Sequence, residues 1–447
     1  MDTNSIDNYI KIRMGKEKIP GVSLGIVKDN KIIYLKGYGK ANEKGDLVTE
    51  KTPFILGSVS KSFTALAIMQ LYESGKLDID KPVKQYLPWF QVKDKEATEK
   101  ITIRNLLTHT SGLSNMTNYD ELIKDDIPLE EFVKKLKDTN ITKPVNATFQ
   151  YSNIGYSILG EVIQKVSGVS YSEYIEKNVF LPLQMNNSYT SQDEAKKNGL
   201  ATGYFSSFMF KIPINQREHI ASIPCGYIIS SAEDMCHYLI ANLNSGIYNK
   251  QPVISESLLE KMHSKIVYFG RGNYYGMGWV SDSDYVWHNG ESENFWSDLF
   301  IDKTKKIGVV MLFNTSDNLA SYDYIARGVM NIAEGNKQDN YIRSSLRPIM
   351  NILLVIFFVL SIVELVSLVR WVKDFEFIDI QVQAEVVKVI FINFIIPIAV
   401  YILGVRGVCN LFNGPAKWMP DVIATVMVLP IALLISGLVK IFMLIKH

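Results

Sequence analysis

The last hundred residues of this 447-residue chain contain three long apolar runs. Any fold proposed for the chain must place these runs in an apolar environment, away from water. The runs cover residues 349–369, 389–405 and 422–445. Their only charged residues are Glu364 and Lys440. A helix that crosses the roughly 30 Å hydrocarbon layer of a bilayer needs about 17–25 apolar residues. We therefore predict an all-α transmembrane domain of three helices over residues 348–447.

A buried helical hairpin in a soluble protein is the alternative interpretation of these runs. Three such runs so close together leave almost no polar face for water, and this favours a lipid bilayer as the partner. Pro397 and Pro430 lie inside the runs and are tolerated in a packed bundle. Glu364 has two interpretations: it faces a partner or a lipid-linked substrate inside the bilayer, or it lies near the membrane interface.

The preceding residues have the composition of a globular domain. The whole chain has 47 Lys and Arg against 46 Asp and Glu, so it lacks the basic stripe of a nucleic-acid binder. Its hydrophobic content of 47% excludes wholesale disorder. The cysteines Cys225, Cys236 and Cys409 form no CxxC pair, which excludes a disulfide scaffold and a cysteine zinc site. We predict one domain over residues 1–338 and a linker over 339–347.

Strand-like patterns occur at both ends of this domain. Near its start they cover residues 22–27 and 31–38, and near its end residues 274–280, 285–288, 296–301 and 308–313. Helical patterns cover residues 6–16, 58–74 and 318–334, and residues 80–250 are mainly helical and loop-like. This order predicts an α/β (α+β) domain: one antiparallel sheet from both termini, flanked by helices, with an all-α subdomain inserted.

Ser58-Val-Ser-Lys61 is the first candidate for catalysis. A serine hydroxyl is a poor nucleophile until a base takes its proton, and the i,i+3 spacing places Lys61 on the same helix face. A helix N-terminus and a partly dry site favour the neutral amine, which can act as that base. The Ser58 N–H would also be available to an oxyanion. The alternative is a helix cap followed by a solvated lysine.

Tyr151-Ser-Asn153 is the second candidate. A phenol beside an ammonium group can be held as the phenolate and serve as a general base. The Asn153 amide, two residues later, could bind either a substrate carbonyl or the lysine. The alternative for Tyr151 is a half-buried aromatic residue without a catalytic role.

His288-Asn-Gly-Glu291, on a predicted strand, is the third candidate. A strand edge can pair with an extended substrate backbone, and Gly290 allows that backbone to come close. The N–H of Glu291 would supply a second oxyanion donor. The alternative for His288 is a surface histidine near a turn.

Together, in this order and spacing, the three motifs resemble the serine β-lactamase and penicillin-binding-protein superfamily. The similarity is to its class C-like branch, which includes D-Ala-D-Ala carboxypeptidases, D-amino-acid peptidases and esterases. It extends over roughly residues 5–335. Four further blocks match: FILGSVSKSFT (54–64), IRNLLTHTSGL (103–113), GYIISSAED (226–234) and YGMGW (275–279).

The resemblance implies a role for each matching residue. Ser58 matches the acylated nucleophile, and Lys61 matches the proton acceptor. Tyr151 matches the base that helps to activate the serine and then protonates the leaving group. Asn153 matches the partner of the substrate amide.

His288 and Gly290 occupy the position where many relatives have Lys-Thr-Gly. This departure is common among esterase and peptidase members. Because neutral histidine holds a carboxylate less strongly than lysine, it lowers the expectation of ordinary penicillin hydrolysis.

No cofactor or metal is expected. His109 lies in a segment that the resemblance places in the framework near the site, and no HExxH or HxH pair accompanies it. The glycines of residues 270–276 miss the GxGxxG spacing of a dinucleotide loop. No GxSxG surrounds Ser58, which excludes the nucleophile elbow of α/β-hydrolases.

We therefore predict a membrane-anchored serine hydrolase that cleaves an amide or ester through an acyl-enzyme. The expected substrate is a small molecule or peptide, lipid-linked or free, of the D-amino-acid type in the cell envelope or a secreted precursor. A penicillin-binding β-lactamase, a non-turnover β-lactam sensor and an inactive scaffold are the alternatives. The sequence leaves the oligomeric state open.

The expected location is the cell membrane, multi-pass, with the catalytic domain on the extracytoplasmic face. The family acts on cell-wall or secreted compounds, and some peptidases that activate natural-product precursors share the layout of a hydrolase followed by three spans. Lys and Arg are divided almost evenly between the two sides, so charge gives little guidance. Residues 1–8 lack the pattern of a signal peptide, so either the sequence starts near a mature boundary or the domain stays inside.

Overall fold

The computed structural model divides into two compact units. The first comprises Met1–Phe205, Pro213–Ser316 and Tyr322–Arg343, and the second comprises Ser206–Ile212, Asp317–Ser321 and Ser344–His447. The residues described are 2–115, 119, 123, 126–207, 210–217, 219–317, 320, 322–336, 347–375, 382–403 and 420–446. The predicted linker at 339–347 lies outside these residues, except for Arg347, which begins a helix.

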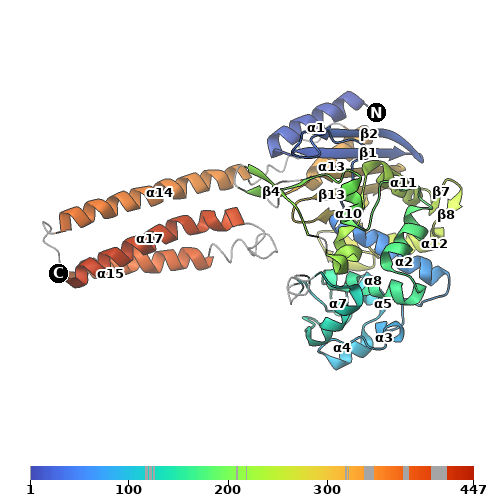
Figure 1. Ribbon diagram of the computed structural model, residues 1–447, viewed down its shortest axis with the longest axis horizontal. Helices are drawn as coiled ribbons and strands as arrows, with labels where there is room; N and C mark the ends of the chain where they lie inside the picture. Colours follow the sequence, from blue (N-terminus) through green and yellow to red (C-terminus); the bar gives the residue numbers. More distant parts are fainter. Residues whose placement is uncertain are drawn as a thin grey trace. The chain divides into compact units, whose positions relative to one another are not determined.

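An eight-stranded antiparallel sheet forms the centre of the first unit (Figure 1). Its order is β2 (Lys31–Gly39), β1 (Gly21–Lys28), β14 (Ile307–Phe313), β13 (Trp296–Asp302), β12 (Val286–Glu291), β11 (Val280–Ser281), β10 (Asn273–Tyr275) and β9 (Val267–Gly270). The two N-terminal strands thus pair with strands from the far end of the domain, and β1 aligns Val22 with Phe313. The predicted sheet from both termini is confirmed.

Helices cover both faces of this sheet. All residues of β14 are buried, because α11 (Ala232–Leu243) and α13 (Tyr322–Ala333) both pack against it and a strand presents alternate side chains to opposite faces. Helix α1 (Thr3–Glu17) packs on α13. The sheet is therefore a layer between helices, and its strand β14 is apolar on both sides.

The predicted helical insertion is also present. Its helices are α3 (Val83–Tyr86), α4 (Lys95–Lys100), α5 (Ile103–Leu107), α7 (Leu129–Lys135), η2 (Leu136–Asp138), α8 (Asn153–Ser167), α9 (Tyr171–Ile175), η3 (Glu176–Phe180) and α10 (Gln192–Lys197). Short elements complete the unit: β3 (Phe54–Ile55), η4 (Ile220–Ser222), η5 (Ile223–Tyr227), β6 (Ile229–Ser230), β7 (Ile247–Tyr248), β8 (Gln251–Pro252), α12 (Glu256–His263) and β15 (Thr315–Ser316). Strands β4 (Gly203–Ser207) and β5 (Phe210–Ile214) are divided between the units, because the range Ser206–Ile212 belongs to the second.

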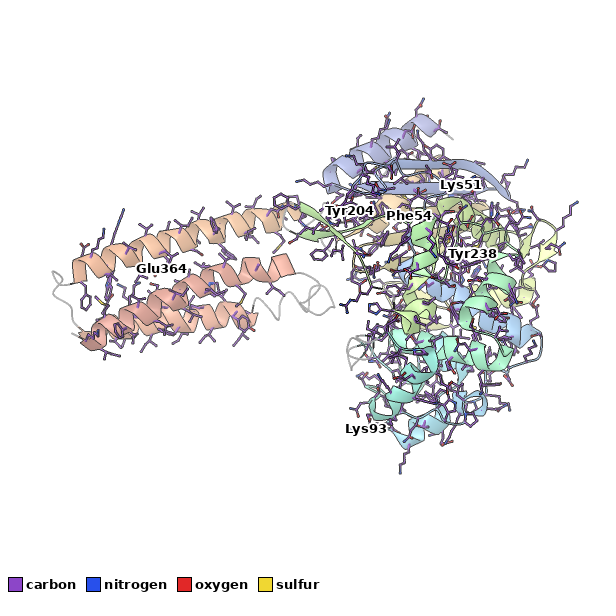
Figure 2. The ribbon with its side chains drawn as sticks, viewed as in Figure 1. Lys51, Phe54, Lys93, Tyr204, Tyr238 and Glu364 are labelled. Carbon is purple, nitrogen blue, oxygen red and sulfur yellow. The ribbon has the colours of Figure 1, made fainter. Side chains whose placement is uncertain are left out.

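Helix α2 (Ser60–Glu73) runs through the interior of the unit. Most of its residues are buried: its N-terminal end carries the polar Ser60, Lys61, Ser62 and Thr64, and the buried residues after them are apolar. The Phe63 ring stacks on Tyr238 of α11 at 4.2 Å between centroids, and Figure 2 labels Tyr238 in the body of the unit. Helices α8 and α11 and the η5 turn surround α2, so its first turn has a fixed position.

The single strand predicted over residues 274–280 is wrong. The chain makes the short strands β10 and β11, which pair with each other and are joined by a turn in which the Gly276 N–H donates to the Trp279 carbonyl at 2.8 Å. Gly278 has a φ of +77°, a conformation that favours glycine. The two glycines of the YGMGW block therefore reverse the chain where a period-2 pattern suggested continuity.

Within its described residues, the second unit contains three helices that are long and apolar enough to cross a membrane. They are α14 (Arg347–Asp374), the stretch Ala384–Leu403 and α17 (Pro420–Lys446). The middle stretch begins in α15 (Val382–Ile390) and contains the π-helical turn η7 (Phe391–Ile395). Only 11% of the most apolar window of α14 is buried. A continuous exposed apolar surface of this kind needs lipid or a partner around it.

Glu364 of α14, labelled in Figure 2, joins these three helices to one another. Its Oε1 atom accepts hydrogen bonds from Ser436 Oγ at 2.6 Å, Lys440 Nζ at 3.1 Å and Asn393 Nδ2 at 3.4 Å. Asn393 belongs to η7, and the other two donors belong to α17. Its partners among the described residues are thus groups of the neighbouring helices, which neither sequence interpretation of Glu364 foresaw.

Candidate active site

Ser58 lies in the 3-10 turn Gly57–Val59, directly before α2. Strand β3 leads into this turn, and its fully buried Phe54, labelled in Figure 2, makes an edge contact with Phe295 at 6.2 Å between ring centroids. Gly57 has a φ of +54°, and a Cβ built on it would lie 2.4 Å from the backbone nitrogen of Glu291. Only glycine fits there, so the serine is held directly against strand β12.

Lys61 is fully buried and has three partners for its Nζ atom. It donates to Cys225 O at 2.6 Å, Asn153 Oδ1 at 2.7 Å and Ser58 Oγ at 3.0 Å. The first two are carbonyl oxygens, which can only accept a hydrogen bond. When the amine is neutral, both of its N–H groups go to these oxygens, and its lone pair faces the Ser58 hydroxyl. The geometry thus orients the lysine as a base toward the serine.

Asn153 is the first residue of α8 and reaches the site from the helical insertion. The Ser152 side chain caps this helix by accepting from the Gly155 N–H at 3.1 Å, and the Asn153 N–H donates to Asn115 Oδ1 at 2.6 Å. In this structure the Asn153 side chain binds Lys61. Of the two partners that the sequence suggested for this amide, it therefore has the lysine.

Tyr151 lies two residues before Asn153 and faces the same lysine. The Lys61 ammonium lies 4.7 Å from the centroid of the Tyr151 ring, within the range of a cation–π contact. Ser58, Lys61 and Tyr151 thus come from two segments about ninety residues apart. The Lys61 amine nitrogen is hydrogen-bonded to the Ser58 hydroxyl and lies over the face of the Tyr151 ring.

Gly290 brings strand β12 against the serine turn. A Cβ built on it would lie 1.9 Å from the Leu56 carbonyl and 2.9 Å from the Ser58 nitrogen. The backbone nitrogens of Ser58 and Glu291 therefore both lie at this contact. Two neighbouring backbone N–H groups are the usual means of stabilising the oxyanion of an acyl transfer. The Glu291 carboxylate accepts from Ser316 Oγ at 2.8 Å.

His288 is buried, with 3% of its surface exposed, so the interpretation as a surface histidine is wrong. Its Nδ1 donates to the Asn289 carbonyl at 2.6 Å, and its Nε2 therefore accepts from the Tyr275 hydroxyl at 3.1 Å. Burial and the nearby Lys61 charge lower the pKa of His288 to about 3. The residue is neutral at physiological pH and adds no positive charge to the site.

Two partners in the site escaped the sequence reasoning. One is the Cys225 carbonyl, a backbone group that any residue type could supply. The only feature of the sequence that pointed to it is the position of Cys225 directly before the GYIISSAED block. The other is the Tyr275 hydroxyl, which was expected on a strand rather than against His288. Among the described residues, no group of three or more His, Cys, Asp or Glu side chains could hold a metal ion.

Comparison with known proteins agrees with this geometry. Residues 6–334 match the family model described as Beta-lactamase. Protein flp of Staphylococcus aureus (strain MW2) is 30% identical over 316 residues, which are 69% of this chain and 62% of that protein. Penicillin-binding protein 4 of Amycolatopsis lactamdurans is 29% identical over 232 residues, 51% of this chain and 61% of that protein. The match thus spans less than two thirds of these relatives' length.

Solved structures share the fold. The octameric penicillin-binding protein homologue from Pyrococcus abyssi has a TM-score of 0.67 and 30% identity over 76% of this chain and 79% of that one. A class C beta-lactamase has a TM-score of 0.65 and 24% identity over 75% of this chain and 97% of that one, a likeness of fold alone. With the family model matched from residue 6 to residue 334, the chain belongs to the beta-lactamase family.

Proposed function

We propose that this protein is a serine hydrolase that cleaves an amide or ester bond through an acyl-enzyme on Ser58. The observation that carries the proposal is the orientation of Lys61. Its two carbonyl partners leave only one direction for the lone pair of the neutral amine, and that direction meets Ser58 Oγ at 3.0 Å. A serine paired with an oriented base is the arrangement that nucleophilic catalysis requires.

The reaction follows from these positions. Ser58 Oγ attacks the substrate carbonyl, and its proton passes to Lys61. The N–H groups of Ser58 and Glu291 hold the oxyanion while the tetrahedral intermediate forms. Tyr151 delivers a proton to the departing amine or alcohol, which leaves the acyl group on Ser58. A water molecule then attacks the ester, loses its proton through the same residues, and releases the acid with the serine restored.

The substrate class is a D-amino-acid-type peptide or ester of the cell envelope, or a secreted precursor. A neutral His288 in the place of a lysine supports this choice, because it holds a substrate carboxylate less strongly. Asn153 is placed to pass from Lys61 to a substrate amide. The three apolar helices support a location in the cell membrane. We place the catalytic domain on the extracytoplasmic face because the proposed substrates are there.

Mass spectrometry of the intact full-length protein in detergent tests the proposal. The protein is incubated with a fluorophosphonate, a fluorescent penicillin and a panel of acyl-D-amino-acid esters, and the modified residue is mapped by proteolysis. We expect an adduct on Ser58 that is lost in Ser58→Ala and kept in Ser74→Ala, an exposed serine at the end of α2. Full labelling of Ser58→Ala at another residue would refute the assignment.

The lifetime of the adduct decides between an enzyme and a sensor. We expect the adduct from an acyl-D-amino-acid ester to disappear as the free acid accumulates over many turnovers. A stoichiometric adduct that persists with every member of the panel would contradict a hydrolase and favour the β-lactam sensor. Rapid turnover of the penicillin alone would favour a β-lactamase.

A further inference from the structure

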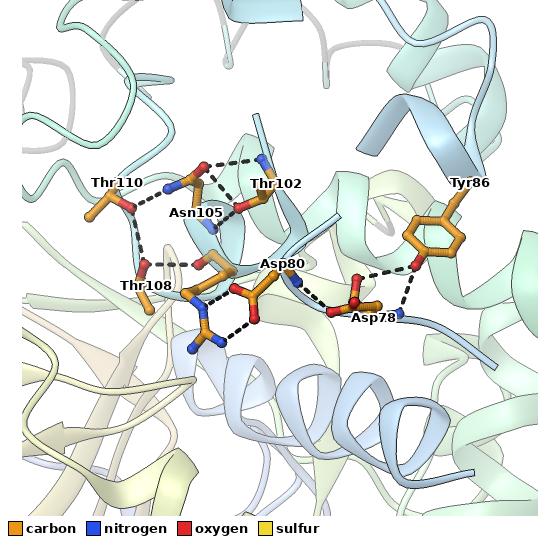
Figure 3. Close-up of polar contacts among 8 residues, drawn as sticks. Asp78, Asp80, Tyr86, Thr102, Asn105, Thr108 and Thr110 are labelled. Atoms are coloured by element: carbon orange, nitrogen blue, oxygen red, sulfur yellow. Dashed lines mark hydrogen bonds and ion pairs between the residues drawn. The ribbon is translucent and has the colours of Figure 1, made fainter. Parts of the chain in front are cut away.

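His109 is a fully buried residue near the site that the proposed reaction does not use. It follows α5 and has a φ of +58°, a conformation that residues other than glycine adopt at a cost. The adjacent hydroxyls hold this turn: Thr108 Oγ1 and Thr110 Oγ1 lie 3.1 Å apart, and Asn105 Nδ2 donates to Thr110 at 3.0 Å (Figure 3). The conformation of His109 is therefore imposed by its surroundings.

The same network continues into the capping box of α5, which Figure 3 also shows. Thr102 Oγ1 accepts from the Asn105 N–H at 3.1 Å, and Asn105 Oδ1 accepts from the Thr102 N–H at 3.1 Å. The side chain of Asn105 thus both caps the helix and holds the turn that follows it. This gives His109 a rigid support outside the catalytic residues.

His109 contacts Tyr151 and the residues on both sides of it. Its carbonyl accepts from the Gln150 N–H at 2.7 Å, and its Nδ1 accepts from the Ser152 N–H at 3.1 Å. These donors are the residues immediately before and after Tyr151. Its ring also packs against the Tyr151 ring, with 4.4 Å between centroids. The backbone on both sides of the phenol is thus fixed to one residue.

The acceptor role of Nδ1 requires a neutral imidazole with its proton on Nε2. The groups around the ring are Phe149, Tyr151, Tyr156 and Tyr275, together with the charge of Lys61 and the neighbouring His288. Burial, and then the nearby charge of Lys61, lower the pKa of His109 well below 6.5.

The Nε2 atom is buried and has no hydrogen-bond partner among the described residues. A residue selected only for packing would not carry this desolvation cost, which is about 1–3 kcal/mol. The value of His109 therefore lies in what its Nδ1 and its carbonyl hold.

We propose that His109 is a positioning residue for Tyr151: it holds the phenol ring against the Lys61 amine by accepting hydrogen bonds from the N–H groups of Gln150 and Ser152. This inference rests on the proposed function, since it assigns a purpose to a catalytic tyrosine. It assigns His109 no contact with substrate.

Two substitutions separate the acceptor from the ring. His109→Phe keeps an aromatic ring and removes the Nδ1 acceptor. His109→Asn removes the ring and keeps an acceptor, because Asn Oδ1 is the same number of bonds from Cα as His Nδ1, and asparagine tolerates a positive φ. The rate of fluorophosphonate labelling of Ser58 is measured in the full-length protein in detergent, with a thermal melt for each variant.

We expect His109→Phe to label about 10- to 100-fold more slowly than the wild type, within the contribution of a general base. We expect His109→Asn to stay within about threefold, because the hydrogen bond to Ser152 is kept. Introduced into Tyr151→Phe, His109→Phe should cause no further loss, because residues that act as one unit are not additive. A loss through general destabilisation would instead recur in that background.

The outcomes are distinct. If the wild type is not labelled on Ser58, the proposed function fails. If the wild type is labelled and His109→Phe labels equally fast, or its loss recurs in full on top of Tyr151→Phe, the positioning role is overturned. If His109→Phe does not fold, His109→Asn decides: labelling within threefold supports the role, and a loss of tenfold or more overturns it.

Discussion

At the scale of single residues, the site depends on the absence of side chains as much as on their presence. Gly57 in the serine turn lies against strand β12, and Gly290 in β12 lies against the serine turn. A Cβ on either glycine would overlap backbone atoms of the opposite segment. This close approach brings the nitrogens of Ser58 and Glu291 to the same place. The proposed nucleophile and the proposed oxyanion donors are therefore positioned by the backbone, which cannot move as a side chain can.

Gly290→Ala should abolish acylation. The added methyl group would lie 1.9 Å from the Leu56 carbonyl, so β12 and the serine turn must separate. We expect labelling of Ser58 by fluorophosphonate to fall at least about 100-fold, the usual effect of losing an oxyanion donor. Gly15→Ala is the matched control, because nothing lies within 4 Å of a Cβ there, and its labelling rate should equal that of the wild type.

The buried histidines make the stability of the fold sensitive to acid. Burial lowers the pKa of His288 to about 3, against an ordinary value of 6.5, and it also lowers the pKa values of His109 and His263. Between pH 6.5 and about 3 the unfolded chain therefore binds protons that the folded chain does not. Stability must fall as the pH falls through this window, and it must be fully present above it.

His288→Gln should weaken this dependence. One fewer proton is taken up on unfolding, so the slope of unfolding free energy against pH should decrease by up to about 1.4 kcal/mol per pH unit. Thermal melts of the wild type and the variant between pH 7 and pH 4.5 measure it. An unchanged slope would show that His288 is not protonated differentially on unfolding.

At the scale of elements, the three apolar helices are held together by polar groups. Glu364 of α14 pairs with Lys440 of α17, and both side chains are mostly covered, with 20% and 14% of their surface exposed. Gly437 allows η7 to pack closely, since a Cβ there would lie 2.6 Å from Asn393 Cβ. In hydrocarbon such groups must find partners within the bundle.

Removing one member of the Glu364–Lys440 pair should cost more than removing both. Glu364→Gln or Lys440→Met leaves one charge without its partner, and losses of about 3–5 kcal/mol are typical of broken buried pairs. The double variant removes both charges and should recover much of the loss. The loss of stability is measured as the shift in the midpoint of thermal unfolding in detergent, with unfolding monitored by size-exclusion chromatography. Single variants as stable as the wild type would contradict this account.

At the scale of the whole molecule, the proposed membrane anchor predicts that the hydrolase unit and the end of α17 lie on opposite sides of a membrane, because the number of proposed spans is odd. Lys93, labelled in Figure 2, is exposed on the hydrolase unit, whereas Cys225 and Cys236 are buried. We expect Lys93→Cys, in a Cys409→Ser background, to react with a membrane-impermeant maleimide in intact cells. The background protein is the control. Reaction only after permeabilisation would place the catalytic domain in the cytoplasm.

Much of this architecture was predictable because it depends on patterns among residues that are close together in the sequence. The Ser58–Lys61 pair follows from i,i+3 spacing on a helix, and the sheet from strand patterns at both ends of the domain. The three apolar helices follow from run length alone. The prediction failed over residues 274–280, where two glycines turn the chain within an apparently continuous strand.

Contacts between segments that are far apart in the sequence could not be predicted from local sequence patterns. The Cys225 carbonyl orients Lys61 from 164 residues away, and the burial that keeps His288 neutral depends on the elements that surround it. A residue pattern predicts which elements form, since propensity and periodicity act over a few residues. Which groups meet, and in which protonation state, depends on packing and desolvation, which exist only once the chain has folded.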